Sequence, residues 1–154
     1  MNVAIACDHG GFDLKEAIIE EIRASKNNPI DLGIFSIKNV DYPDYAEKIG
    51  NAIREGTAER GILICGSGVG ACIAANKLKG IYASVCHDTY SAHQGVEHDN
   101  MNVLCMGGRI LGAELAKEIT RAFLQAEFSP EERHLRRTRK IRQLEEIGFI
   151  SRED

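Results

Sequence analysis

The segment GILICGSGVG at residues 61–70 decides how this chain folds. Residues 61–65 form a continuous apolar run, which is typical of a strand buried on both faces of a parallel sheet. The glycines at positions 66, 68 and 70 permit a tight turn, and residues 71–77 have a helical pattern. The segment therefore predicts a strand, a glycine-rich turn and a helix in succession, which is one unit of an α/β fold.

The same alternation continues on both sides of this unit. Further strands are predicted at 3–6, 30–33, 81–85 and 102–105, and further helices at 14–22, 43–53, 89–97 and 111–124. A repeated strand-then-helix order predicts a parallel sheet of five strands with helices on both faces and right-handed crossovers. Residues 129–154 begin with Ser-Pro-Glu-Glu, which is typical of a helix start, and we expect this added helix to reach beyond its own domain.

The composition is typical of one globular domain spanning residues 1–154. With 19 basic and 23 acidic residues, the formal net charge is −4, which argues against a protein that coats nucleic acid. No window approaches about 18 apolar residues, so we expect no membrane-spanning helix. The N-terminal sequence MNVAIACD has no basic region and is not expected to be a signal peptide. Five cysteines without a C-x-x-C pair indicate reduced thiols and therefore a cytoplasmic protein.

Reactive residue types gather where the predicted strands end. Cys-Asp-His follows the first strand at 7–9, Cys-His-Asp lies at 86–88, and Gly-Gly-Arg follows the last strand at 107–109. A further polar run, His-Asp-Asn, lies at 98–100, just before the fifth strand. Because ligands bind beyond the carboxyl ends of parallel strands, these residues predict a site at one edge of the sheet.

The glycine loop after Cys65 suits the binding of an anion. Its N–H groups can point inward at the start of the next helix and hold a phosphate or a developing oxyanion. A thiol beside such donors becomes a better base or nucleophile, which makes Cys65 a candidate catalytic residue. The alternative is a tight turn without a ligand. The other cysteines are interpreted as small buried hydrophobic residues: Cys7, Cys72, Cys86 and Cys105.

Two further features carry ionisable groups. His98 lies in a polar run, where an imidazole can donate or accept a proton near neutral pH. Residues 133–142 hold six Lys or Arg, and in a helix Arg133 and Arg137 share one face that can grip a phosphate. The alternative is a solvated face that pairs with neighbouring glutamates. A metal site is not favoured, because His93 and His98 are five residues apart and do not share a helix face.

Several segments match one known family in order along the chain. They are CDHGG at 7–11, DYPDYA at 41–46, GILICGSGVG at 61–70, AANK at 74–77, NVL at 102–104 and RHxxR at 133–137. Together they resemble the ribose-5-phosphate isomerase B family, whose sugar-phosphate isomerases include the galactose-6-phosphate isomerase subunits. The resemblance implies a Rossmann-like three-layer α/β/α sandwich without metal or organic cofactor. It also implies a homodimer or a dimer of dimers, with sites between subunits.

The resemblance also assigns roles to residues. Cys65 would move a proton between C1 and C2 of an aldose phosphate through a cis-enediolate, while His98 would assist opening of the furanose ring. Asp8 would lie at the sugar hydroxyls. The anion hole would come from Gly66, Ser67, Gly68, Val69 and Gly70. The phosphate would be held by His9, Arg109, Arg133 and Arg137, some of them from the partner subunit.

One departure from the family pattern bears on the substrate. Asp99 follows His98 where the common pattern has Asn, which places a carboxylate beside the sugar. Ribose 5-phosphate is the expected substrate, with allose, galactose and tetrose phosphates as alternatives. An NAD-binding domain is a competing hypothesis, because the glycine loop opens a helix and Asp88 follows about 20 residues later. A redox-sensing or structural homodimer without enzymatic activity is a third.

Overall fold

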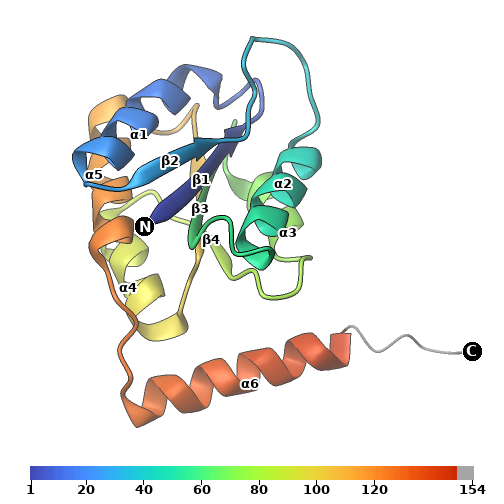
Figure 1. Ribbon diagram of the computed structural model, residues 1–154, viewed down its shortest axis with the longest axis vertical. Coiled ribbons are helices and arrows are strands. Elements are labelled where there is room, and N and C mark those ends of the chain that lie inside the picture. The colour runs from blue at the N-terminus through green and yellow to red at the C-terminus, as the bar shows by residue number, and fades with distance from the viewer. Residues whose placement is uncertain (149–154) are drawn as a thin grey trace, which may run out of the picture.

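The computed structural model describes residues 1–148, in which strands and helices alternate as expected (Figure 1). The strands are β1 (Asn2–Cys7), β2 (Asn28–Asp31), β3 (Arg60–Cys65), β4 (Ala83–Val85) and β5 (Val103–Gly107). The helices are α1 (Phe12–Ala24), α2 (Tyr42–Arg54), α3 (Val69–Ala75), α4 (Thr89–Asp99), α5 (Ala113–Gln125) and α6 (Glu132–Gly148).

All pairs in the five-stranded sheet are parallel, in the order β2-β1-β3-β5-β4. The central strand β3 pairs with β1 on one side and β5 on the other, so that Cys7 aligns with Ile64 and Cys65 with Gly107. We call the edge where the strands end the carboxyl edge and the edge where they begin the amino edge. The parallel α/β fold predicted from the sequence is confirmed.

Helices cover both faces of the sheet. One layer contains α1, α4 and α5, whose buried residues Ile18, Val96 and Phe123 pack against the sheet. The opposite layer contains α2 and α3, and Ile49 of α2 is fully buried there. Burying each such side chain contributes about 2 kcal/mol of stability. Because helices cover both faces of the sheet, the side chains of the strands are buried on both faces too, and the strands are almost continuously apolar.

The last helix, α6, stands apart from these two layers (Figure 1). It packs against α4, and its Glu145 accepts hydrogen bonds from the Gly80 N–H at 2.7 Å and the Tyr82 hydroxyl at 3.2 Å. Both partners immediately precede β4, so α6 lies at the amino edge. The sequence predicted a helix over 129–154; it begins later, at Glu132, and residues 149–154 lie outside the described residues.

Several other boundaries differ from those predicted. The second strand occupies Asn28–Asp31 instead of 30–33, and β4 begins at Ala83 instead of residue 81. The fifth strand continues to Gly107, two residues beyond its predicted end. Helix α3 begins at Val69, before its predicted start, because Gly68 adopts a left-handed conformation (φ +81°) that turns the chain directly into the helix.

Candidate active site

Backbone atoms of three loops touch one another at the carboxyl edge. A Cβ atom at Gly10 would lie 2.8 Å from the Gly66 nitrogen, and one at Gly108 would overlap with the Gly10 carbonyl oxygen. The Gly108 N–H donates to the Cys65 carbonyl at 2.8 Å, which ties the loop after β5 to the end of β3. The glycines after β1, β3 and β5 are therefore required for this close packing.

A pocket of about 340 Å³ opens beside these loops. We call it the carboxyl-edge pocket; it is lined by Asp8, Tyr42, Cys65, Gly66, Ser67, Gly70, Arg109 and Ile110. Most of these residues were expected at a site from their positions at strand ends. The structure thus brings a thiol, a carboxylate and a guanidinium to one opening.

Cys65 is held at the base of the glycine loop. Its side chain is 4% exposed, and the Gly68 N–H donates a hydrogen bond to its sulfur at 3.1 Å. The backbone N–H groups of Gly66 and Ser67 have no acceptor within residues 1–148. A thiol that faces unpaired backbone donors has the arrangement needed for proton transfer next to a developing oxyanion.

Asp8 and Arg109 place opposite charges at the same pocket. The Asp8 carboxylate is 6% exposed and accepts hydrogen bonds from the N–H groups of Gly10 at 2.8 Å and Gly11 at 3.2 Å. These bonds fix the carboxylate while leaving lone pairs for other donors. The exposed Arg109 guanidinium lies against Gly66, where a Cβ would be 3.4 Å from its Nη1. His9, next to Asp8, is exposed at this edge.

Tyr42 also belongs to this pocket, although sequence reasoning did not select it. It is the first residue of α2, and its ring lies so close to Gly70 that a Cβ there would be 2.6 Å from the Tyr42 Cζ. The sequence feature that could have identified Tyr42 is its place in DYPDYA at 41–46, at the start of a helix that follows a strand and a loop. Gly70 lets the ring lie against the glycine loop, and the phenol adds a hydrogen-bonding group at the rim.

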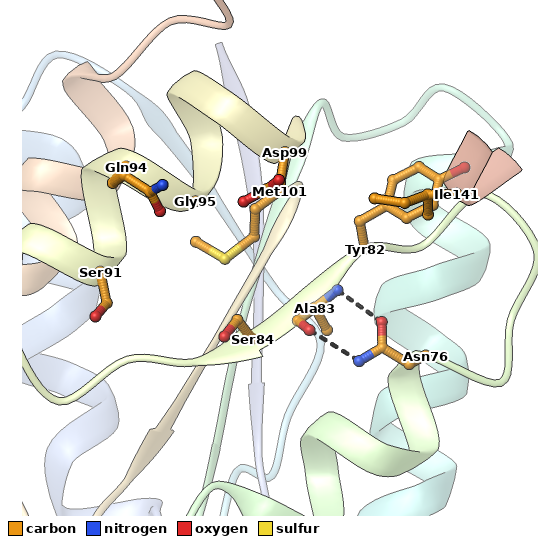
Figure 2. A pocket seen from close by; sticks show the side chains of 10 residues that line it. All are labelled: Asn76, Tyr82, Ala83, Ser84, Ser91, Gln94, Gly95, Asp99, Met101 and Ile141. Carbon is orange, nitrogen blue, oxygen red and sulfur yellow. Dashed lines mark hydrogen bonds between the residues drawn. The ribbon is translucent and has the colours of Figure 1, made fainter. Parts of the chain in front are cut away.

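The predicted site residues on α4 and α6 lie at the amino edge. His98 is in the last turn of α4, before β5 begins at Val103, whereas Cys65 aligns with Gly107 at the end of β5. Five residues of parallel strand separate these levels by about 13 Å. Asp99 also lies at this edge. It lines a second pocket, of about 410 Å³, beside β4 and Tyr82 (Figure 2).

The two arginines of the basic segment lie on α6. Arg133 and Arg137 are both exposed, and within residues 133–142 of the described chain only Arg133 forms an ion pair, with Glu131 at 2.9 Å. Glu145 and Glu146 contact Tyr82 and Lys79 instead of this segment. The alternative, in which this segment pairs with neighbouring glutamates, thus holds for Arg133 alone and leaves most of the positive charge available.

The other four cysteines fall into two groups. Burial raises the pKa of Cys7 and Cys86 to about 11, and Cys105 is also fully buried, so these three behave as expected. Cys72 differs because it is half-buried. A hydrogen bond with Cys105 lowers the pKa of Cys72 to about 7 and raises that of Cys105.

The described residues contain neither a metal-binding cluster nor a membrane-spanning helix. Within residues 1–148, His, Cys, Asp and Glu side chains form no group of three or more that could hold a metal ion. In the same part of the chain, no helix combines the length and apolar character needed to cross a membrane.

Comparisons with known proteins identify the family. The chain matches the Ribose/Galactose Isomerase family over residues 3–141. It is 43% identical to ribose-5-phosphate isomerase B of Escherichia coli (strain K12), over 94% of this chain and 96% of that protein. It is also 43% identical to D-erythrulose-4-phosphate isomerase of Pectobacterium atrosepticum, over 83% of this chain and 85% of that protein. A solved ribose-5-phosphate isomerase B from Clostridium thermocellum has a TM-score of 0.92 at 40% identity, over 96% of this chain and 99% of that one. The chain therefore belongs to the ribose/galactose isomerase family and is an isomerase.

Proposed function

We propose that this isomerase interconverts an aldose phosphate and a ketose phosphate, with ribose 5-phosphate as the preferred substrate and Cys65 as the base. The observation that carries the proposal is the buried Cys65 sulfur, which lies beside unpaired backbone N–H groups in a pocket that also holds Asp8 and Arg109. A related protein named ribose-5-phosphate isomerase B supports the choice of sugar. We place the enzyme in the cytoplasm.

The reaction proceeds through a cis-enediolate. The Cys65 thiolate takes the proton from C2 of the open-chain aldose, the electron pair forms the C1–C2 double bond, and the carbonyl electrons move to O1. The N–H groups of Gly66 and Ser67 stabilise this oxyanion. A proton then passes from O2 to O1, and the thiol returns its proton to C1, which leaves a ketone at C2. The fixed Asp8 carboxylate orients the sugar hydroxyls.

A second copy of the chain completes the site. His98, Asp99, Arg133 and Arg137 cannot reach the carboxyl-edge pocket of their own chain, because they lie at the opposite edge of the sheet. In a two-fold dimer, the amino edge of one copy meets the carboxyl edge of the other at both sites. The side chains of Val69 and Ile73 on α3 are 53% and 58% exposed next to the catalytic loop, and they provide apolar surface for such a contact.

Phosphate binding uses charges from both copies. Arg109 and His9 lie at the pocket of one copy, and Arg133 and Arg137 project from α6 of the other. Guanidinium groups bind phosphate through paired hydrogen bonds, and binding at this remote group supplies energy that positions the reacting carbons. Helix α6 thus acts as an arm that contacts the partner subunit.

A tetrose phosphate is the second candidate substrate. The relative named D-erythrulose-4-phosphate isomerase is as similar in sequence as the ribose-5-phosphate isomerase B from Escherichia coli. Asp99 bears on this choice, because a carboxylate beside the sugar changes which hydroxyls can donate to it. The competing NAD-binding hypothesis has less support, since the isomerase family covers residues 3–141.

A panel of pentose, hexose and tetrose phosphates in deuterated water tests reaction class and substrate together. We expect the highest kcat/KM with ribose 5-phosphate and deuterium at C1 of the ketose, because the proton exchanges at the enediolate stage. A higher kcat/KM with a tetrose phosphate would show that the tetrose phosphate, and not ribose 5-phosphate, is the preferred substrate. Thermal stabilisation by NAD, with none by any sugar phosphate, would contradict the isomerase mechanism.

A further inference from the structure

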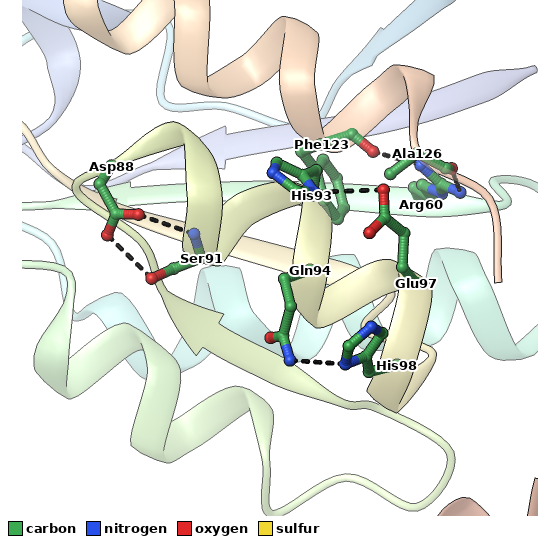
Figure 3. Close-up of polar contacts among 9 residues, drawn as sticks. All are labelled: Arg60, Asp88, Ser91, His93, Gln94, Glu97, His98, Phe123 and Ala126. Carbon is green, nitrogen blue, oxygen red and sulfur yellow. Dashed lines mark hydrogen bonds and ion pairs between the residues drawn. The ribbon is translucent and has the colours of Figure 1, made fainter. Parts of the chain in front are cut away.

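The side chain of Gln94 lies within hydrogen-bond distance of the His98 ring. The Gln94 Nε2 lies 2.8 Å from the His98 Nδ1, one helical turn away on α4 (Figure 3). An amide nitrogen has hydrogens but no free lone pair, so Nδ1 must be the acceptor. A neutral imidazole carries one proton, which therefore resides on Nε2.

His134 fixes the plane of the same ring. Its imidazole stacks on that of His98, with centroids 4.1 Å apart and planes inclined by 26°. His134 is 1% exposed, and neither of its ring nitrogens has a hydrogen-bond partner within the described residues. Burying these nitrogens without partners is unfavourable, so the position of the ring must be set by packing and not by hydrogen bonds. In that position the His134 ring covers one face of His98.

These two contacts leave the Nε2 edge of His98 as its reactive side. Gln94 occupies Nδ1, and His134 covers one ring face. The Gln94 side chain also lines the pocket beside β4 together with Asp99 and Met101 (Figure 2). The His98 ring therefore has a defined orientation and a defined proton position before any substrate binds.

A fixed Nε2–H matches a specific chemical need of cyclic sugars. Opening a furanose breaks the bond between C1 and the ring oxygen, and the electron pair remains on that oxygen, which must gain a proton. At the same time the anomeric hydroxyl gives its proton to solvent water as the C1 carbonyl forms, and the imidazole that protonated the ring oxygen regains a proton from solvent, so that both end neutral. An imidazole in the Nε2–H form can supply the first proton, whereas the other neutral tautomer can only accept one there.

We propose that Gln94 is a positioning residue that holds His98 as the Nε2–H tautomer and so makes His98 the proton donor to the ring oxygen of a cyclic substrate. The inference rests on the proposed function, in which His98 reaches the pocket of a partner copy. In this role Gln94 acts through His98.

The variant Gln94→Glu inverts the hydrogen bond, because a carboxylate can only accept. At about pH 9, where imidazole side chains are neutral, the proton then moves to Nδ1 and leaves Nε2 without one. Glu97→Gln is the matched control: it makes the reverse change one turn along the same helix, where Glu97 pairs with His93 at 3.1 Å (Figure 3). Both variants keep His98 and His134.

Two reactions of the same enzyme separate ring opening from proton transfer. Ribose 5-phosphate is cyclic, whereas ribulose 5-phosphate cannot form a furanose because its C5 oxygen carries the phosphate. We expect Gln94→Glu to slow isomerisation about tenfold and to leave solvent deuterium exchange at C1 of ribulose 5-phosphate within about twofold of the wild type. We expect Glu97→Gln to change neither rate.

Nitrogen-15 NMR of the labelled histidines gives the second readout. We expect the wild-type His98 to show an unprotonated Nδ1 and the Gln94→Glu variant to show a protonated one. Equal loss of isomerisation and exchange in Gln94→Glu, unchanged isomerisation, or a protonated Nδ1 in the wild type would overturn the inference. Absence of both reactions in the wild-type enzyme, with any pentose phosphate, would instead overturn the proposed function and this inference with it.

Discussion

The two edges of the sheet are built in different ways. At the carboxyl edge, backbone atoms of three glycine-containing loops touch, and they hold Cys65 and Asp8 in a pocket that forms within one chain. At the amino edge, side chains make the contacts: Gln94 and His134 hold His98, and Glu145 anchors α6. The arrangement at the carboxyl edge is thus set by strand ends, whereas the arrangement at the amino edge depends on how two helices pack.

The largest effect is expected from removing the thiol at the carboxyl edge. Cys65→Ala should lower kcat by about a thousandfold or more, because the step from aldose to enediolate then has no positioned base. The removed sulfur is small, so the thermal midpoint should stay within about 4 °C of the wild type. Steady-state kinetics and calorimetry measure both quantities. An active variant would remove Cys65 from the mechanism.

Mixing subunits tests whether the two edges come from different chains. Cys65→Ala and His98→Asn each disable one half of the site for ribose 5-phosphate. In a mixed dimer, one site regains both Cys65 and His98, so co-refolded variants should recover about a quarter of wild-type activity under random pairing. Each variant alone is the control. A mixture as inactive as its parts would show that the site does not span two copies.

Close backbone packing makes the carboxyl edge intolerant of added atoms. Gly108→Ala should lower the free energy of unfolding by about 2 kcal/mol, because its Cβ would overlap with the Gly10 carbonyl. Gly112→Ala is the matched control, since a Cβ there meets nothing within 4 Å, and it should change stability by less than about 0.5 kcal/mol. Urea titration measures both. Equal stability of the two variants would show that the loops adjust without strain.

The basic face of α6 should affect substrate binding more than chemistry. Arg137→Ala should raise KM about tenfold and leave kcat nearly unchanged, because one charge-assisted contact to phosphate is lost. Arg139→Ala, on another face of the same helix, is the control and should leave KM unaltered. Identical kinetics of the Arg137 variant and the wild type would indicate that this face is only solvated.

The anchor of α6 gives the smallest expected effect. Glu145→Gln weakens the hydrogen bonds to the Gly80 N–H and the Tyr82 hydroxyl, which should raise KM about threefold without changing kcat. Hydrogen exchange should become faster in α6 and stay unchanged in the central strands. Faster exchange in β3 as well would mean that the amino edge is not an independent unit.

Sequence reasoning predicted the carboxyl edge well and the amino edge poorly, for a physical reason. Asp8, Cys65 and Arg109 follow strands directly, and parallel strands bring their ends together regardless of detail. Tyr42 was missed because it follows a long loop, and its approach to Gly70 depends on how α2 packs. Cys72 was interpreted as an ordinary buried cysteine, since its hydrogen bond with Cys105 joins residues far apart in the chain.

The amino acid sequence by itself determined the α/β class, the glycine-rich turn after β3 and the residue types available for chemistry. Apolar runs and glycine turns act locally, so they can be recognised from neighbouring residues. Only the tertiary structure decided that His98, Arg133 and Arg137 lie at the opposite edge from Cys65, and that Gln94 and His134 hold the His98 ring. These positions depend on the order of strands in the sheet and on the packing of α4 against α6. Both bring together segments that are far apart in the sequence, so the pattern of neighbouring residues does not reveal them.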